Sequence, residues 1–256
     1  MPIQRVLAAT DGRSNGEHAV AVGRALAQQA NGEFMRLAVE TEDSLPGPAS
    51  GWRAEPATLT GTVTRIGGLP GVEIVRQAET WGADLVLLGR EESSPERPHN
   101  LGVTSDTVVR RRSGLSLFVP PEVQTIRRAM IALDGSLRGL GGVGLTVPFL
   151  NLTKAGTKAI CVLPGMQPDA TDTGRDLRHE RVAVLIDLLH LDAGACELLL
   201  RWGDPVPEIL RAIRENRSDL LVLGVRRGGL RGDLGSGYVG RELLKSAPCA
   251  VLTVPI

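Results

Sequence analysis

The sequence predicts an α/β protein of two tandem domains, each a doubly wound, mostly parallel five-stranded sheet flanked by helices. One observation is an internal repeat: segment 83–89, Ala-Asp-Leu-Val-Leu-Leu-Gly, recurs at 218–224 as Ser-Asp-Leu-Leu-Val-Leu-Gly. Each half also begins with a short apolar run that ends in Asp-Gly, at 6–12 and at 130–136. The other observation is that such runs alternate with segments of helical periodicity. That alternation is typical of right-handed βαβ units, whose parallel sheet is covered on both faces.

The first half begins with a strand at 6–9, because its apolar run stops at an Asp-Gly turn signal. A helix follows, since apolar residues then recur at helical spacing. Ser14 is a candidate N-cap, and Glu17 three residues later completes the spacing of a capping box. Residues 34–39 are expected to form the second strand.

The middle of the first half is less regular. Segment 40–56 holds three prolines and predicts an irregular loop. Residues 58–66 alternate in β-branched side chains and predict a third strand. Pro70 suits the first position of a helix, and the apolar run 84–88 predicts a strand buried on both faces. The remaining elements expected in this half are a helix at 103–112 and a strand at 115–119.

The second half repeats this order with fewer interruptions. Pro205 and Pro207 suit the first turn of its third helix, with Asp204 as the cap. The expected strands are 129–133, 158–163, 196–201, 219–223 and 250–254, and the expected helices are 139–152, 174–190, 205–216 and 238–246. A short stiff linker, Pro-Pro-Glu-Val-Gln-Thr, joins the halves. The predicted domains are therefore 1–122 and 123–256.

Composition excludes several classes of partner. The 29 basic and 29 acidic residues balance, so nothing points to nucleic acid or to an anionic membrane. Aromatic residues make up only 3% of the chain, too few for the stacking platforms of single-strand binders. No run approaches the about 18 apolar residues of a membrane span, and no signal peptide is recognised, so a cytoplasmic location is expected. Three cysteines lie in apolar runs without metal-ligand spacing and are expected to be buried, reduced thiols: Cys161, Cys196 and Cys249.

The candidate binding site lies beyond the carboxyl ends of the strands, where strand order reverses in such sheets. Gly89 and Gly102 are thirteen positions apart, and Gly224 and Gly237 repeat this spacing, which fixes the length of a loop before the last helix of each half. The second-half loop holds five glycines from 228 to 237, and it also carries Arg226, Arg227, Arg231 and Ser236. Glycines let backbone N–H groups approach an anion, and a helix N-terminus adds partial positive charge. This loop predicts phosphate binding, with a flexible turn that binds nothing as the alternative.

Two further patterns lie at the same edge. Gly-x-Gly-x-x-Gly occurs at 139–144 and 235–240, but a dinucleotide fold needs an acidic residue at the end of the second strand. Segment 159–164 contains none, which excludes a dehydrogenase. Asp11 and Asp134 follow the first strand of each half and are candidates to contact a ribose or adenine; a turn or cap role is the alternative.

Taken together, four segments resemble the universal stress protein family in its tandem form. They are Thr10-Asp11-Gly12, its counterpart 133–136, the segment 83–89 and the closing segment 247–254. The resemblance covers both halves. It implies an adenine-nucleotide alpha-hydrolase-like fold and a dimer-like pairing of the halves within the chain, and it leaves a further homodimer open. Some members bind ATP through an aspartate after strand one, an apolar residue ending strand two, and a loop Gly-x2-Gly-x9-Gly-Ser/Thr; others bind no nucleotide.

Carried over by position, the resemblance is incomplete in both halves. Glu92 and Arg227 replace the middle glycine, and Val103 and Tyr238 replace the final hydroxyl. The first-half loop also places three carboxylates where phosphates would lie, and like charges at close range repel. ATP, with or without Mg, is therefore expected in the second half. The implied contacts there are Asp134, Gly135, Val162, Gly224, Arg226, Arg227, Gly235, Ser236, Gly237, Tyr238 and Val239. Their weaker first-half counterparts are Asp11, Val39, Gly89, Gly102, Val103 and Thr104.

No arrangement of a nucleophile and a base is visible in the sequence, and no metal-ligand cluster is either. The expected function is therefore a stress-response regulatory protein that binds an adenine nucleotide, with slow ATP hydrolysis as its only conceivable catalysis. The alternative is a universal stress protein that binds no nucleotide and acts through its dimer or protein-interaction surface.

Overall fold

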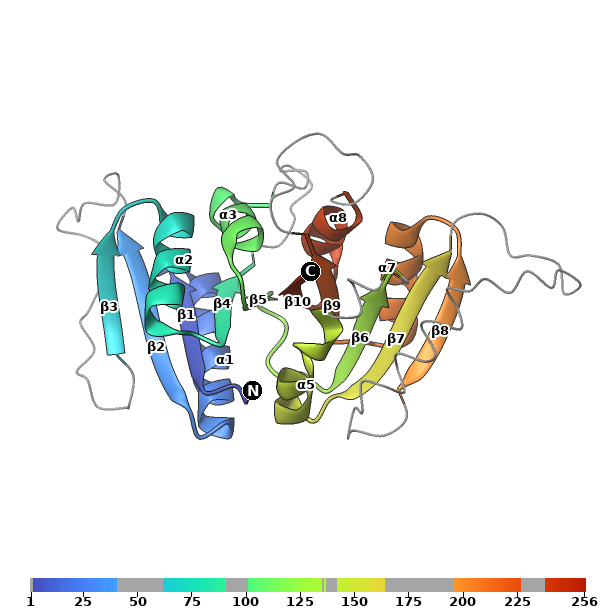
Figure 1. The fold of residues 1–256 in the computed structure, drawn as a ribbon, viewed down its shortest axis with the longest axis horizontal. Coiled ribbons are helices and arrows are strands. Elements are labelled where there is room, and N and C mark those ends of the chain that lie inside the picture. Colours follow the sequence, from blue (N-terminus) through green and yellow to red (C-terminus); the bar gives the residue numbers. More distant parts are fainter. Residues whose placement is uncertain are drawn as a thin grey trace, which may run out of the picture.

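The two halves form one continuous ten-stranded sheet in the computed structural model (Figure 1). The structure describes residues 2–40, 62–90, 101–134, 136, 142–163, 196–226 and 238–256. The strand order is β3-β2-β1-β4-β5-β10-β9-β6-β7-β8, so the order in one half mirrors that in the other. Each half contributes five strands, as expected.

The first half contains every element that the sequence predicts for it outside the loops. These are β1 (Arg5–Thr10), α1 (Ser14–Gln29), β2 (Glu33–Glu40), β3 (Thr62–Gly67), α2 (Pro70–Trp81), β4 (Leu85–Gly89), α3 (Val103–Arg111) and β5 (Leu115–Val119). All neighbouring strands of this half pair in parallel. The expected loop 41–56 and residues 58–61 of the expected third strand lie outside the described residues.

The second half repeats this plan. Its elements are β6 (Arg128–Leu133), α5 (Val147–Thr153), β7 (Gly156–Leu163), β8 (Glu197–Trp202), α7 (Pro205–Glu215), β9 (Leu220–Val225), α8 (Tyr238–Ser246) and β10 (Ala250–Pro255). Its neighbouring strands are again parallel. The expected helix 174–190 lies outside the described residues.

The prediction of one continuous helix over 139–152 is wrong for residues 142–152, the part of it that the structure describes. Residues 142–144 are helical, a turn follows at 145–146, and α5 starts anew at Val147. Pro148 at the start of α5 explains the break. Proline has no N–H to donate, and its ring clashes with the carbonyl four residues earlier, so the first segment cannot run on into the second.

Two predicted helix caps had different outcomes. Asp204 caps α7 as expected, because its side chain accepts a hydrogen bond of 3.1 Å from the N–H of Val206. The capping box at Ser14 is wrong: α1 begins at Ser14 itself, and its cap residue Arg13 makes no side-chain cap bond. Glu17, the other half of the predicted box, has different partners that are described with the site.

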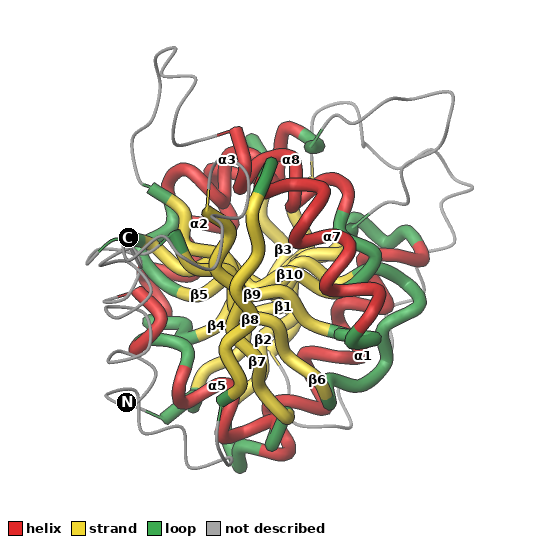
Figure 2. Tube along the Cα trace, turned by 90° about the vertical axis from the view of Figure 1, so that its right-hand side faces the viewer, coloured by secondary structure: helices red, strands yellow, loops and turns green. Residues whose placement is uncertain are grey.

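The seam between the halves is an antiparallel pair, β5 with β10. Phe118 lies opposite Val251 in its register, and the hydroxyl of Thr253 donates to the carbonyl of Ser116 across it at 3.3 Å. Helices cover both faces of the sheet (Figure 2). One buried cluster lies under α1 and α5, and the other lies under α2, α3, α7 and α8. Each cluster contains residues of both halves, so the core runs through the seam.

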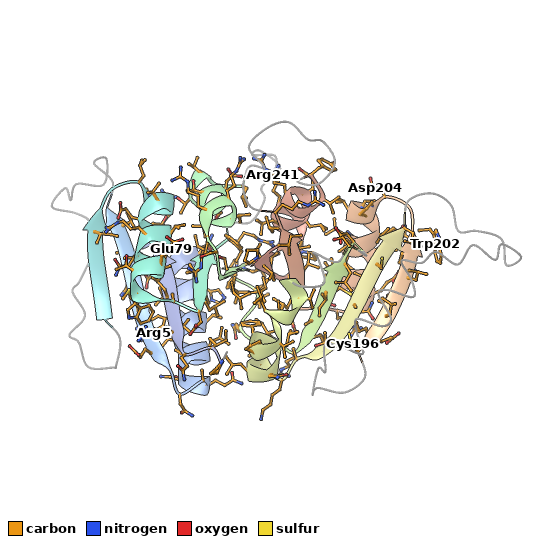
Figure 3. The ribbon with its side chains drawn as sticks, in the orientation of Figure 1. Arg5, Glu79, Cys196, Trp202, Asp204 and Arg241 are labelled. Atoms are coloured by element: carbon orange, nitrogen blue, oxygen red, sulfur yellow. The ribbon has the colours of Figure 1, made fainter. Side chains whose placement is uncertain are left out.

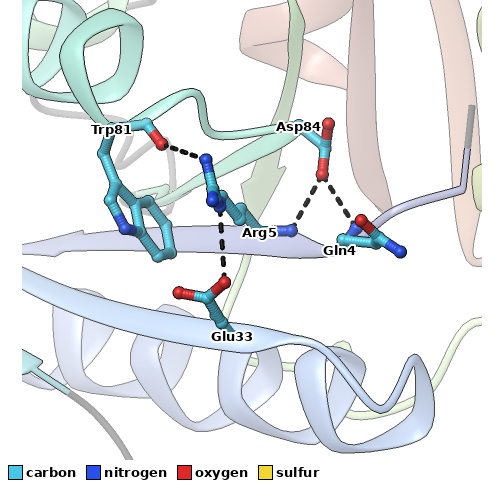
Figure 4. A network of polar contacts seen from close by, with 5 residues as sticks. All are labelled: Gln4, Arg5, Glu33, Trp81 and Asp84. Atoms are coloured by element: carbon cyan, nitrogen blue, oxygen red, sulfur yellow. Dashed lines mark hydrogen bonds and ion pairs between the residues drawn. The ribbon is translucent and has the colours of Figure 1, made fainter.

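The repeated Asp-Leu segment has a structural role that explains its recurrence. Asp84 lies just before β4 and accepts two hydrogen bonds of 2.8 Å from the N–H groups of Gln4 and Arg5 at the start of β1 (Figure 4). Asp219 does the same before β9, accepting bonds of 2.9 and 2.8 Å from the N–H groups of residues 127 and 128. In both halves a carboxylate therefore fixes the start of the first strand against the fourth.

Candidate functional site

Strand register brings the predicted site residues of the first half to one edge of the sheet. The last β1–β2 pair is Thr10 with Ala38, so Asp11 follows β1 beside Val39 of β2. Gly89 ends β4, the other neighbour of β1.

The second half repeats this arrangement at its own carboxyl edge. The last β6–β7 pair is Leu133 with Cys161, so Asp134 follows β6 beside Val162 of β7. Gly224 lies near the end of β9, the other neighbour of β6. The three positions that the sequence singled out in each half are thus brought together by the parallel strands.

Both aspartates sit in the same type of turn. Asp11 accepts a hydrogen bond of 3.0 Å from the N–H of Arg13, and Asp134 accepts one of 2.9 Å from the N–H of Ser136. Gly12 has a φ of 82°, a conformation that favours glycine. Both aspartates are exposed, and each accepts its turn bond at one oxygen. The other oxygen of Asp11 also lies 3.5 Å from Nε of Arg13 in an ion pair.

A polar network occupies the carboxyl edge of the first half. The hydroxyl of Thr10 donates to Glu17 at 2.8 Å, and Arg36 donates to the same carboxylate oxygen at 2.7 Å. The side chain of Arg36 is only 17% exposed. Glu17 is therefore held inward by these two partners, which is why it does not complete a capping box.

The second half has apolar residues at the matching positions. Register matches Thr10 with Leu133 and Arg36 with Ala159. By sequence spacing, Leu140 stands where the first half has Glu17, although its structure lies outside the described residues. The two halves therefore differ in chemistry here: the first has an ion pair and a hydroxyl where the second has the buried aliphatic side chains of Leu133 and Ala159.

The first loop glycine has a packing reason in each half that the sequence did not reveal. A Cβ at Gly89 would clash with the carbonyl of Asn15, so the first turn of α1 lies directly on the end of β4. A Cβ at Gly224 would lie 3.1 Å from the side chain of Ile256, which also contacts Gly142. Ile256 thus forms an apolar wall at the second-half edge.

The loop ends contribute the start of the last helix in each half. Gly102 precedes α3 without any side-chain cap, and Val103 and Thr104 form its first turn, with Val103 86% exposed. In the second half, Arg226 follows β9 and is exposed, while α8 begins with Tyr238, 55% exposed, and the half-buried Val239. The other predicted second-half residues lie outside the described part of the chain: Gly135, Arg227, Gly235, Ser236 and Gly237.

Arg90 is a residue that sequence reasoning missed. It follows Gly89 in the first half, yet its guanidinium donates to the carbonyls of Leu244, at 3.1 Å, and Ala247 at the end of α8 in the second half. Burial lowers the pKa of Arg90 from its ordinary value. Nothing in the sequence around Arg90 signals a partner more than 150 positions away.

The described cysteines are not suited to thiolate chemistry. None of the three forms a disulfide; Cys161 and Cys249 are buried, as expected, whereas Cys196 is only half-buried. Burial raises the pKa of Cys196 to about 11 and that of Cys249 to about 12. Within the described ranges no group of three or more His, Cys, Asp or Glu side chains could hold a metal ion, and no described helix is long and apolar enough to cross a membrane.

Comparison with known proteins identifies the family. The model of the universal stress protein family matches residues 126–255, half of the chain, and the chain belongs to this family. Its fold is similar to that of a universal stress protein from Archaeoglobus fulgidus DSM 4304, with a TM-score of 0.73, 17% identity, and coverage of 99% of this chain and 98% of that one. It is also similar to a functionally unknown protein from Pseudomonas aeruginosa PAO1, with a TM-score of 0.69, 13% identity, and coverage of 99% and 92%. No curated protein matches the sequence.

Proposed function

We propose that this universal stress protein binds an adenine nucleotide, ATP, at the carboxyl edge of its second half and acts in the cytoplasm as a nucleotide-responsive regulatory protein. The observation that carries the proposal is that Asp134, directly after β6, lies between Val162 of β7 and Gly224 of β9, with the side chain of Ile256 against Gly224. An exposed carboxylate can accept hydrogen bonds from ribose hydroxyls, and aliphatic side chains can contact the face of adenine.

The difference between the halves supports one site rather than two. In the first half, Glu17 and Arg36 are already paired across the position where the second half has Ala159 and Leu133. A ligand at the first-half edge would compete with this partly buried ion pair for its hydrogen bonds, which costs free energy. In the second half the matching described residues, Leu133 and Ala159, form no ion pair, so binding a ligand there does not carry this cost.

Positive charge and helix geometry supply the phosphate end of the proposed site. Arg226 leaves the end of β9 exposed, and α8 begins at Tyr238 after the glycine-rich segment. The first N–H groups of a helix have no partner within the helix and carry partial positive charge, so they favour a phosphate. Binding, rather than catalysis, is the proposed activity.

The alternative function, through a dimer surface without nucleotide, is less well supported. The strand edges that could join two such sheets, β5 and β10, pair with each other inside this chain. A partner protein would therefore have to use another surface.

Matched aspartate variants test the proposal. Asp134→Ala should weaken binding of Mg-ATP at least tenfold, whereas Asp11→Ala should leave the affinity unchanged. Both aspartates make the same turn bond, so the pair controls for loss of the turn itself. Gly237→Val and Gly102→Val form a second pair, with loss of binding expected only for the first. Equal effects of both members of each pair, or no binding by the wild-type chain freed of co-purified nucleotide, would contradict the proposal.

A further inference from the structure

A half-buried arginine of the first half, Arg90, holds the last helix of the second half. The Nη1 of Arg90 donates to the carbonyl of Leu244 at 3.1 Å, and its Nη2 donates to the carbonyl of Ala247. Both carbonyls belong to the C-terminal end of α8 or follow directly after it. The last carbonyls of a helix have no partner within the helix, and a cation there also favours the helix dipole.

The base of this arginine is fixed in the first half. Arg90 directly follows β4, and its N–H donates to the carbonyl of Val119, the last residue of β5, at 2.9 Å. The backbone is therefore tied to two strands while the guanidinium reaches the other half. Removing a guanidinium partly from water costs free energy unless its donors are satisfied. The two carbonyl groups satisfy donors of Arg90, and α8 is thereby held where its C-terminal end meets the guanidinium.

A second contact joins the same helix to the first half. Arg241 of α8 forms an ion pair of 3.4 Å with Asp106 of α3, at the top of the seam where α3 and α8 lie on either side (Figures 1 and 3). Asp106 also pairs with Arg110 at 2.7 Å. Arg241 is half exposed, so this pair contributes little alone. The two part-buried hydrogen bonds of Arg90 are the stronger link.

We infer that Arg90 is a positioning residue for the second-half nucleotide site, because it fixes α8 from the first half and the N-terminus of α8 adjoins that site. This inference rests on the proposed function. The same link works in both directions: a nucleotide that orders the start of α8 also strengthens the contact between the halves, since a coupling between two sites is reciprocal.

Arg112 provides a matched control within the first half. It is a buried arginine and, like Arg90, donates to two backbone carbonyls, those of Ala83 at 2.6 Å and Leu115 at 3.3 Å. Burial lowers its pKa to about 10. Arg90→Met and Arg112→Met thus remove similar groups, but only the first removes a bond to α8.

Two measurements on the full chain test the inference: hydrogen exchange of the amides of 238–246 without nucleotide, and calorimetric titration with Mg-ATP. For Arg90→Met we expect at least tenfold faster exchange in α8 and at least tenfold weaker ATP binding. For Arg112→Met we expect wild-type values in both, even if its melting temperature falls. Arg90→Lys keeps the charge but not the paired hydrogen bonds, so its exchange rate in α8 and its ATP affinity should lie between those of the wild type and Arg90→Met. This variant replaces Arg90→Met in the test if Arg90→Met does not fold.

The two proposals fail in different ways. Wild-type exchange in α8 together with wild-type ATP affinity in Arg90→Met overturns the positioning role and leaves the nucleotide site standing. A wild-type chain that binds no ATP overturns the proposed function, and then faster α8 exchange confined to the Arg90 variants still supports the positioning of α8 by Arg90. Equal effects of the Arg90 and Arg112 variants on α8 would show general destabilisation and overturn the inference.

Discussion

The two halves should unfold as one cooperative unit, because the core runs through the β5–β10 seam. Phe118 is 0% exposed and lies opposite Val251 of the other half. The cluster that contains it also contains buried residues of α3 and α8, one helix from each half. Truncation of a fully buried Phe to Ala costs about 3–5 kcal/mol, from lost transfer free energy and from the cavity that remains. Phe118→Ala should therefore lower the free energy of unfolding of the whole chain by that amount.

Tryptophan fluorescence can report on each half separately. Trp81 ends α2 in the first half, and Trp202 ends β8 in the second. In urea titrations of two variants, one keeping only Trp81 and one keeping only Trp202 of the three tryptophans of the chain, both reporters should show the same midpoint. Both midpoints should fall together in Phe118→Ala.

A perturbation far from the seam makes the test sharper. Leu37 of β2 is fully buried in the first half. Leu37→Ala should cost about 2–5 kcal/mol, and it should shift the Trp202 transition as much as the Trp81 transition. Two separate midpoints in the wild-type chain, or a Leu37→Ala effect confined to Trp81, would refute the reasoning.

Three other predictions follow from single residues. Asp84→Asn and Asp219→Asn should each lower the free energy of unfolding by about 1–3 kcal/mol, because each weakens two charge-assisted bonds to backbone N–H groups. Urea titration measures this change. Near-zero effects would show that these bonds do not stabilise the starts of the strands. Gly89→Ala should lower the free energy of unfolding by about 1–3 kcal/mol, because the added methyl group overpacks against α1. Gly102 faces open space, so Gly102→Ala should leave the stability nearly unchanged. Equal melting temperatures of the two variants would contradict this prediction. Burial raises the pKa of Cys249 from 9.0 to about 12, so the unfolded chain loses this proton at lower pH and stability should fall as pH rises from 9 towards 12. Cys249→Ala should flatten that alkaline decline, and an unchanged slope would argue against the burial of the thiol.

The fold was predictable from the sequence because its signals are local and occur twice. Short apolar runs that end in Asp-Gly, and the repeated Asp-Leu segment, define strands whose order the structure confirms. The continuous helix 139–152 failed because helical periodicity outweighed Pro148, which allows a new helix to start but not the old one to continue. The capping box at Ser14 failed because Glu17 has a stronger partner, Arg36, that is distant in sequence.

The site was predictable only in part, because some of its contacts join residues that are distant in sequence. Asp134 and Val162 could be placed together because parallel strands end at one edge of the sheet. The contrast between Arg36 and Ala159 was visible only once strand register aligned the two halves. Arg90 could not be found, since its partners are carbonyl groups, which every residue carries and no sequence pattern marks.

The stoichiometry of Mg-ATP on the nucleotide-free wild-type chain tests the central claim most directly. Calorimetric titration should give one site per chain, which is lost in Asp134→Ala and retained in Asp11→Ala. Two equivalent sites, or a single site that disappears with Asp11→Ala and survives Asp134→Ala, would contradict the assignment of nucleotide binding to the second half.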